Sequence, residues 1–146
     1  MILDIDVGNT RVKYRLTGKS DAKAIACSHQ ELLPNLRRLP LEDIAIVRIA
    51  SVASSDLVSA ISRELEKYVR GKIVTAKSVA HCAGVTNSYA EPQKLGVDRW
   101  LAIIAAYSCF QAPCIVIDAG SAITVDVVDG DGLHQGGWIV PGLYLQ

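Results

Sequence analysis

The sequence predicts an α/β fold, a mixed β-sheet flanked by helices, and two observations carry this prediction. First, short apolar runs with the length of strands alternate with amphipathic helical patterns. Second, one pattern occurs twice: an apolar run ending in Asp, any residue, Gly, a small polar residue and a second β-prone run. The copies are Ile5–Leu16 and Ile117–Val128. Each copy predicts a strand, a tight glycine turn and a returning strand, so we expect a duplicated fold.

The N-terminal segment predicts three strands. Residues 2–7 alternate between an apolar and an acidic face, and residues 11–17 return as a second strand. Gly8 is expected to make the first turn because it tolerates positive φ. A second turn is predicted at 18–21 and a third strand at 22–27.

A helix, a strand and a second helix are predicted next. Ser28–Glu31 has the form of a capping box. Because Pro34 is costly beyond the first helical turn, we expect the helix to begin near Leu33. A buried strand is predicted at 44–49, and the clearest helix at 56–70, capped by Ser55 and ended by Gly71.

The C-terminal half predicts a long loop between regular elements. Residues 72–75 form a short strand, 76–97 an irregular loop of the kind that is often functional, and 98–110 a helix. Its inner stripe is predicted as Leu101, Ile104, Ala105 and Ser108. After the second copy of the pattern, residues 129–132 (Asp-Gly-Asp-Gly) predict a hairpin turn and 133–140 its returning strand.

The element order predicts two domains of unequal completeness. Residues 1–111 are expected to form a first domain, and residues 112–146 only the opening of a second one. We therefore expect a longer protein, and no kinase activity from residues 1–146 alone.

Composition excludes several classes of protein. Lys+Arg and Asp+Glu both number 15 among 146 residues, so a nucleic-acid partner is not indicated. No apolar run approaches a membrane span and no signal peptide is apparent, which predicts a cytoplasmic protein without a membrane partner. The four cysteines lack CxxC spacing, so we expect reduced, mostly buried thiols rather than a metal site.

The two Asp-x-Gly hairpins carry the candidate chemistry. Backbone N–H groups at a glycine turn can converge on a phosphate, and the side chains of Asn9, Thr10 or Ser121 can add hydrogen bonds. Each aspartate can hold Mg²⁺, its waters or another cation against that phosphate. The alternative is a pair of ordinary hairpin turns.

Four motifs in order resemble those of the type III pantothenate kinases, a family that includes proteins called Bvg accessory factors. They are Asp6-x-Gly8-Asn9-Thr10, Gly96-x-Asp98-Arg99-Trp100, Asp118-x-Gly120-Ser121-Ala122 and Gly136-Gly137-x-Ile139-x-Pro141-Gly142. The resemblance implies a ribonuclease H-like (actin-like ATPase) fold in two duplicated domains that clasp ATP. It also implies ATP-dependent phosphorylation of pantothenate to 4′-phosphopantothenate, the first step of coenzyme A biosynthesis.

The same resemblance implies roles for particular residues. Asp98 would be the general base, and Asp118 would hold a monovalent cation, K⁺ or NH₄⁺. By its place at the end of a strand before the glycine turn, Asp6 is the candidate for the Mg²⁺ bound with ATP. The implied ATP contacts are Asp6, Val7, Gly8, Asn9, Thr10, Arg11, Val12, Lys13 and Ser121. The implied pantothenate contacts are Tyr89, Gly96, Val97, Asp98 and Arg99.

Simpler roles stand beside these. Asp98 could merely serve the helix dipole, Arg99 could form a surface salt bridge instead of pairing with the substrate carboxylate, and Tyr89 could pack its loop. His29, His81 and His134 receive no role. The family implies a homodimer; a non-catalytic nucleotide-binding accessory protein and a sugar kinase of the same fold remain alternatives.

Overall fold

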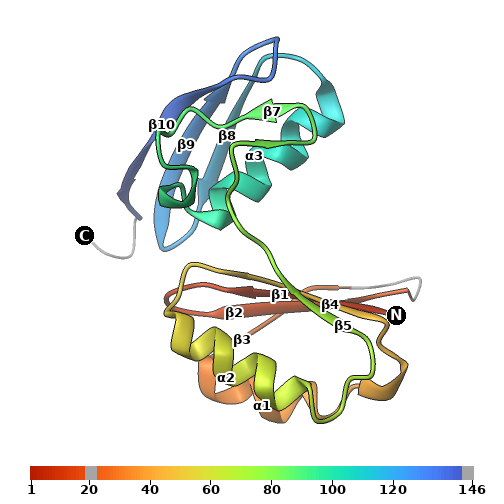
Figure 1. Cartoon of the computed structure of the whole chain (residues 1–146). Coiled ribbons are helices and arrows are strands. Elements are labelled where there is room, and N and C mark those ends of the chain that lie inside the picture. The colour runs from red at the N-terminus through yellow and green to blue at the C-terminus, as the bar shows by residue number, and fades with distance from the viewer. Residues whose placement is uncertain (19–22, 143–146) are drawn as a thin grey trace. The chain divides into compact units, whose positions relative to one another are not determined.

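The computed structural model describes residues 1–18 and 23–142. They form two compact units, Met1–Ala76 and Lys77–Gln146, and each is described here by itself (Figure 1). The predicted turn at 18–21 and the start of the predicted strand at 22–27 lie largely outside the described residues. Among the described residues, no helix is long and apolar enough to cross a membrane.

The first unit is built on a five-stranded mixed sheet of order β3-β2-β1-β4-β5. Its strands are β1 (Ile2–Val7), β2 (Val12–Thr17), β3 (Ile25–Cys27), β4 (Ile46–Ser51) and β5 (Lys72–Thr75). The first three pair antiparallel, whereas β1, β4 and β5 run parallel. Both helices of the unit, α1 (His29–Leu36) and α2 (Ser55–Leu65), lie on the same face of this sheet (Figure 1).

The predicted start of the first helix near Leu33 is wrong. Helix α1 begins at His29 because the capping box forms: Ser28 Oγ accepts the Glu31 N–H, and a Glu31 carboxylate oxygen accepts the Ser28 N–H. Pro34 lies inside the helix, and Leu32 and Leu36 on either side of it are buried in the core of the unit. A 3₁₀ turn, η1 (Leu41–Asp43), then leads into β4.

Helix α2 is capped by Ser54 and ends at Leu65, so the predicted cap at Ser55 and end at residue 70 are wrong. Gly71 therefore does not end a helix. A Cβ on Gly71 would lie 2.1 Å from the Ala45 carbonyl oxygen, which accepts the Lys72 N–H at 3.0 Å. Glycine is needed here because the chain passes directly over the backbone before β5.

The core of the first unit lies between the sheet and its helices; its members include Leu3, Ile5, Val47, Ile61 and Leu65. On another part of the sheet, Asp4 accepts hydrogen bonds from Arg48 at 2.6 and 3.0 Å and from Arg15 at 3.2 Å. Desolvation opposes ionisation of the Asp4 carboxyl, but these two arginines outweigh it and hold its pKa below the usual range.

The second unit contains a three-stranded antiparallel sheet of order β10-β9-β8. Its strands are β8 (Cys114–Ala119), β9 (Ala122–Val128) and β10 (His134–Pro141), and helix α3 (Val97–Phe110) packs on it. The predicted turn at 129–132 is confirmed: Asp129 Oδ1 accepts the N–H groups of Asp131 and Leu133.

The segment 76–97, predicted to be irregular, contains a small hairpin of β6 (His81–Cys82) and β7 (Val85–Thr86), then a 3₁₀ turn, η2 (Pro92–Lys94). Two residues with positive φ, Ala83 at 49° and Gly84 at 83°, make the hairpin turn. The turn is held by the rest of the unit, since the Thr86 N–H donates to the Gly132 carbonyl at 2.9 Å.

The predicted inner stripe of α3 is largely wrong. The buried helix residues are Val97, Arg99, Trp100 and Ile103, while Leu101 is 40% exposed. Of the predicted stripe, only Ile104 packs partly against the core, which comprises Val85, Leu95, Trp100, Ile103 and Val128.

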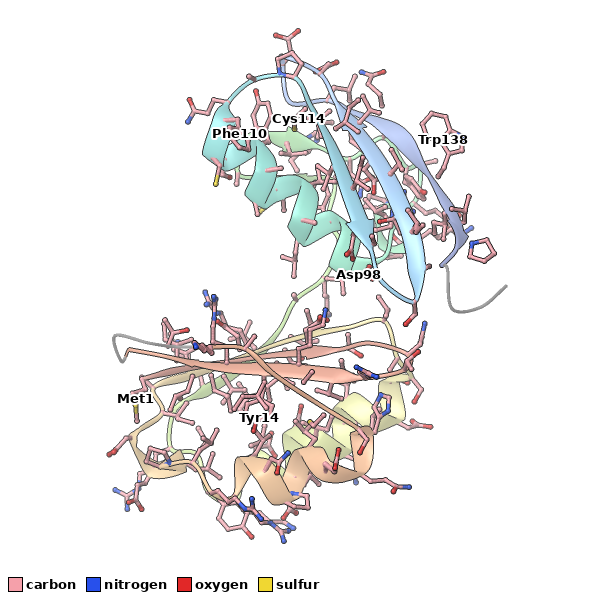
Figure 2. All side chains as sticks on the ribbon, turned by 180° about the vertical axis from the view of Figure 1, so that it is seen from behind. Met1, Tyr14, Asp98, Phe110, Cys114 and Trp138 are labelled. Atoms are coloured by element: carbon pink, nitrogen blue, oxygen red, sulfur yellow. The ribbon has the colours of Figure 1, made fainter. Side chains whose placement is uncertain are left out.

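The other face of this sheet is open and apolar. Ile115, Ile117 and Trp138 are each about two-thirds exposed, and Trp138 points away from the sheet (Figure 2).

The expectation of mostly buried thiols is wrong, because Cys82 and Cys109 are exposed while Cys27 is buried.

Candidate functional site

The first Asp-x-Gly hairpin joins β1 to β2. Asp6 is paired with Lys13 and Val7 with Val12 across the strands, and the Gly8 N–H donates to the Arg11 carbonyl at 3.0 Å. Gly8 does not have the positive φ that we expected. It is favoured instead by space, since a Cβ would lie 3.0 Å from that carbonyl oxygen.

Exposure in this hairpin separates polar from apolar residues. Val7 and Val12 are buried in the core of the first unit. The exposed residues are Asp6, Asn9, Thr10, Arg11 and Lys13. The hairpin therefore presents two cationic side chains and the amide and hydroxyl side chains to solvent, a set that suits an anion with several oxygens.

His29 holds the tip of this hairpin. Its Nε2 lies 2.9 Å from the Gly8 carbonyl oxygen. Because a carbonyl can only accept, Nε2 carries the proton and donates it. His29 is the first residue of α1, so the capped helix is tied to the hairpin. The sequence assigned His29 no role, since a contact across 21 positions has no local signature.

The second hairpin joins β8 to β9 with a tighter turn. The Gly120 N–H donates to the Ala122 carbonyl at 2.9 Å, and Asp118 and Ser121 are exposed. The final glycine of the fourth motif lies against it: the Gly142 N–H donates to the Ser121 carbonyl at 3.1 Å. A Cβ on Gly142 would lie 2.6 Å from two carbonyl oxygens of this turn.

Asp98 lies in the first turn of α3, after Gly96 as N-cap (Figure 2). Its side chain is exposed, and its Oδ1 accepts the N–H of Arg99 at 2.8 Å. One carboxylate oxygen is thus oriented by the helix backbone. The other can accept a proton from a bound alcohol, as a general base requires.

Arg99 is not on the surface. It is 7% exposed and makes a two-point ion pair with Asp126, from Nε to Oδ2 at 2.8 Å and from Nη2 to Oδ1 at 2.6 Å. Hydrogen bonding to Asp126 raises the pKa of Arg99. The surface salt bridge considered as its simpler role is therefore excluded. Asp126 thus occupies the Nε/Nη2 edge of the guanidinium, and Nη1 lies on the edge that Asp126 does not bind.

Asp126 and His134 extend this buried pair. Asp126 is 1% exposed and His134 is fully buried, with His134 Nε2 2.9 Å from Asp126 Oδ1. His134 Nδ1 lies 3.3 Å from Ser88 Oγ. The ring of Tyr89 stacks on His134 with centroids 6.1 Å apart, and the Tyr89 hydroxyl is 3.5 Å from Arg99 Nη1.

Asn87 fixes the loop that carries Tyr89. Its Oδ1 accepts the Tyr89 N–H at 3.0 Å, and its Nδ2 lies 3.4 Å from the carbonyl oxygens of Val79 and Pro92. Asn87 is buried, so these bonds replace water. Sequence reasoning named Tyr89 but missed Asn87.

The predicted metal residues, Asp6 and Asp118, belong to different units. Within residues 1–18 and 23–142, no group of three or more His, Cys, Asp or Glu side chains is placed to hold a metal ion. Each aspartate is an exposed carboxylate at the end of a strand, beside a hairpin turn. One hard oxygen ligand of this kind suits a cation whose remaining ligands are phosphate and water.

Comparison with known proteins gives one family. The protein-family model described as type III pantothenate kinase matches residues 2–146 of this chain. The curated protein of that name from Pseudomonas savastanoi pv. phaseolicola is 39% identical over 149 residues, covering 99% of this chain and 60% of that protein. The one from Pseudomonas aeruginosa is 38% identical, with the same coverage. The chain thus spans about 60% of the length of these relatives.

Solved structures support the fold. A putative N-acetylglucosamine kinase from Porphyromonas gingivalis matches with a TM-score of 0.51 at 14% identity, over 94% of this chain and 47% of that one. The Aquifex aeolicus Ppx/GppA phosphatase matches with a TM-score of 0.50 at 11% identity, over 99% and 53%. The predicted α/β, actin-like fold class is confirmed by these likenesses and by the mixed sheet with its helices.

Proposed function

The chain belongs to the type III pantothenate kinase family, and from this premise we propose that the protein phosphorylates pantothenate with ATP. The product is 4′-phosphopantothenate, and the reaction opens coenzyme A biosynthesis. The observation that supports the proposal best is the family match over 2–146 together with an exposed aspartate, Asp98, in the first turn of α3.

In this proposal the β1–β2 hairpin binds the phosphates of ATP. Arg11 and Lys13 supply exposed positive charge, and Asn9 and Thr10 supply amide and hydroxyl groups. The Gly8 N–H already donates within the turn, so the hydrogen-bond donors for phosphate would come from the residues that follow Gly8. Val7 and Val12 hold the strands beneath them, and Ser121 adds a second ATP contact.

Asp98 would act as the general base. As the primary hydroxyl oxygen of pantothenate attacks the γ-phosphorus, its proton passes to the Asp98 carboxylate, and the bond to the leaving ADP breaks. The Arg99 N–H that binds Oδ1 orients the carboxylate for this transfer.

Pantothenate itself would be bound by Tyr89, Gly96, Val97 and Arg99. Because two nitrogens of Arg99 are held by Asp126, we propose that Arg99 meets the substrate carboxylate through Nη1, beside the Tyr89 hydroxyl. This contact is a charge-assisted hydrogen bond from the edge of the guanidinium that Asp126 does not bind.

Two cations fit the donors described above. Asp6 would hold Mg²⁺ bound with ATP, directly or through its waters, and Asp118 would hold K⁺ or NH₄⁺. These cations would offset the negative charge of the phosphates. We further propose a cytoplasmic homodimer with no nucleic-acid or membrane partner, and a second duplicated domain that begins near residue 112.

The test is turnover by the protein in its full natural length. With ATP, Mg²⁺ and pantothenate, formation of 4′-phosphopantothenate is expected, and Asp98→Asn should lower kcat by about 10²-fold or more. Asp131→Asn, an exposed aspartate of the β9–β10 turn, is the matched control. Robust turnover by Asp98→Asn would remove Asp98 as base.

A substrate panel separates the alternatives. Phosphorylation of sugars instead of pantothenate would indicate a sugar kinase. Nucleotide binding without any phosphoryl transfer would indicate an accessory protein.

A further inference from the structure

We propose that Asp126 and His134 are positioning residues for pantothenate, because together they set the places of Arg99 and Tyr89. The inference rests on the proposed function and deepens it. Neither residue belongs to the motifs from which the family roles were carried over. Both are buried, and they contact Arg99 and Tyr89, which the family resemblance assigns to the substrate.

The first step of the argument is that Arg99 has one orientation. Its Nε and Nη2 bind the two oxygens of Asp126 at 2.8 and 2.6 Å, which fixes both the plane and the rotation of the guanidinium. The fixed plane leaves Nη1 directed to the Tyr89 hydroxyl. Asp126 lies on β9 and Arg99 on α3, so a residue of the sheet orients a side chain of the helix.

The second step concerns His134, which contacts both Asp126 and Tyr89. Ionised Asp126 can only accept, so His134 Nε2 carries the proton and donates to Oδ1. With that proton on Nε2, Nδ1 is placed to accept from the Ser88 hydroxyl at 3.3 Å. The ring face stacks on Tyr89 at an interplanar angle of 13°. The Tyr89 ring is thus placed by a side chain that is itself fixed.

The third step explains the Gly136-Gly137 motif, which the proposed function leaves unused. A Cβ on Gly137 would lie 2.3 Å from Asp126 Oδ1 and 2.6 Å from Arg99 Nη2. The strand register shifts between His134 and Gly137, and Gly136 has a φ of +96°. This irregularity lets His134 reach Asp126 while Gly137 passes over the ion pair.

The experiment measures pantothenate binding and steady-state kinetics of the full natural protein. For Asp126→Asn we expect the KM and Kd for pantothenate to rise about tenfold or more, with the KM for ATP within about twofold. The matched control is Asp131→Asn, which makes the same chemical change in the exposed turn between β9 and β10.

A double-mutant cycle separates positioning from general damage. If Asp126 acts through Arg99, then Asp126→Asn should add little to the pantothenate KM in an Arg99→Gln background. That double variant also removes both buried charges, so it remains informative if the single variant folds poorly. His134→Gln keeps a hydrogen-bond donor for Asp126 but loses the ring that stacks on Tyr89. It should raise the KM for pantothenate and leave the KM for ATP unchanged.

The outcomes divide cleanly. Pantothenate parameters that stay within about twofold in Asp126→Asn, or effects on pantothenate and ATP of equal size, would overturn the inference and leave the proposed function standing. A parent protein that neither binds nor phosphorylates pantothenate would overturn both.

Discussion

Replacing Gly137 by alanine should disrupt the second unit severely. The added Cβ would lie 2.3 Å from both Asp126 Oδ1 and the Val125 carbonyl oxygen, and 2.6 Å from Arg99 Nη2. Relief requires a shift of about 1 Å, since ordinary contacts of this kind begin near 3.4 Å. The backbone oxygen cannot move without parting β9 from β10, and the carboxylate cannot move without loosening the buried ion pair.

The expected cost follows from these two effects. Overpacking of a close contact costs about 1–3 kcal/mol, and breaking a buried ion pair costs about 3–5 kcal/mol. Since the strain can be relieved by one route or the other, we expect a loss of roughly 3 kcal/mol in the free energy of unfolding. Against a typical stability of about 5–15 kcal/mol this is a large fraction.

Urea denaturation followed by far-UV circular dichroism measures this loss. Gly130→Ala is the matched control, because its Cβ would meet only carbons of the Pro113 ring at 3.5 and 3.7 Å. That control should be neutral or stabilise by less than about 1 kcal/mol. If the two alanine variants unfold within about 0.5 kcal/mol of each other, the close packing of Gly137 on the ion pair is refuted.

Three further predictions concern single side chains. Two arginine partners hold the Asp4 pKa low, so Asp4 contributes stability above the unfolded pKa near 3.8 that is lost as pH falls through the lower folded value. In urea titrations, the stability lost in Asp4→Asn should therefore be largest at neutral pH and shrink as the pH falls below 3.8. Burial raises the pKa of the Cys27 thiol, whereas Cys82 is exposed. Iodoacetamide should therefore modify Cys82 well before Cys27, as followed by mass spectrometry over time. Equal rates of modification would contradict the burial of Cys27 in this fold. Trp138 is 67% and Trp100 1% exposed, so acrylamide should quench one emission component of the 146-residue chain, and Trp138→Phe should remove it.

Much of the fold followed from local patterns. Strands, their hairpins and the capping box are short-range features, and they were predicted because each has its own chemistry. The errors occurred where distant packing decides. The β6–β7 turn uses Ala83 at positive φ, which no turn rule favours. The predicted stripe of α3 missed Trp100 and Ile103, because nearly every position of this helix outside its first turn is apolar and the sequence alone does not select the buried face.

The candidate site divides in the same way. The exposed polar groups of the two hairpins and the place of Asp98 in the first turn of a helix followed from motif and spacing. Asp126 and His134 were missed because their partners are far along the chain; Asp126 lies 27 positions from Arg99. A charged residue inside an otherwise apolar strand was the one available signal, since buried carboxylates need a partner.

The two copies of the Asp-x-Gly pattern use their glycine in the same way. In each copy the glycine N–H is consumed by the turn itself, toward Arg11 in one and Ala122 in the other. The glycine therefore fixes the shape of the turn, whereas Asn9, Thr10 and Ser121, which follow it, are exposed. Substitutions at those exposed positions can therefore change the side chains that one hairpin presents while both turns keep their shape.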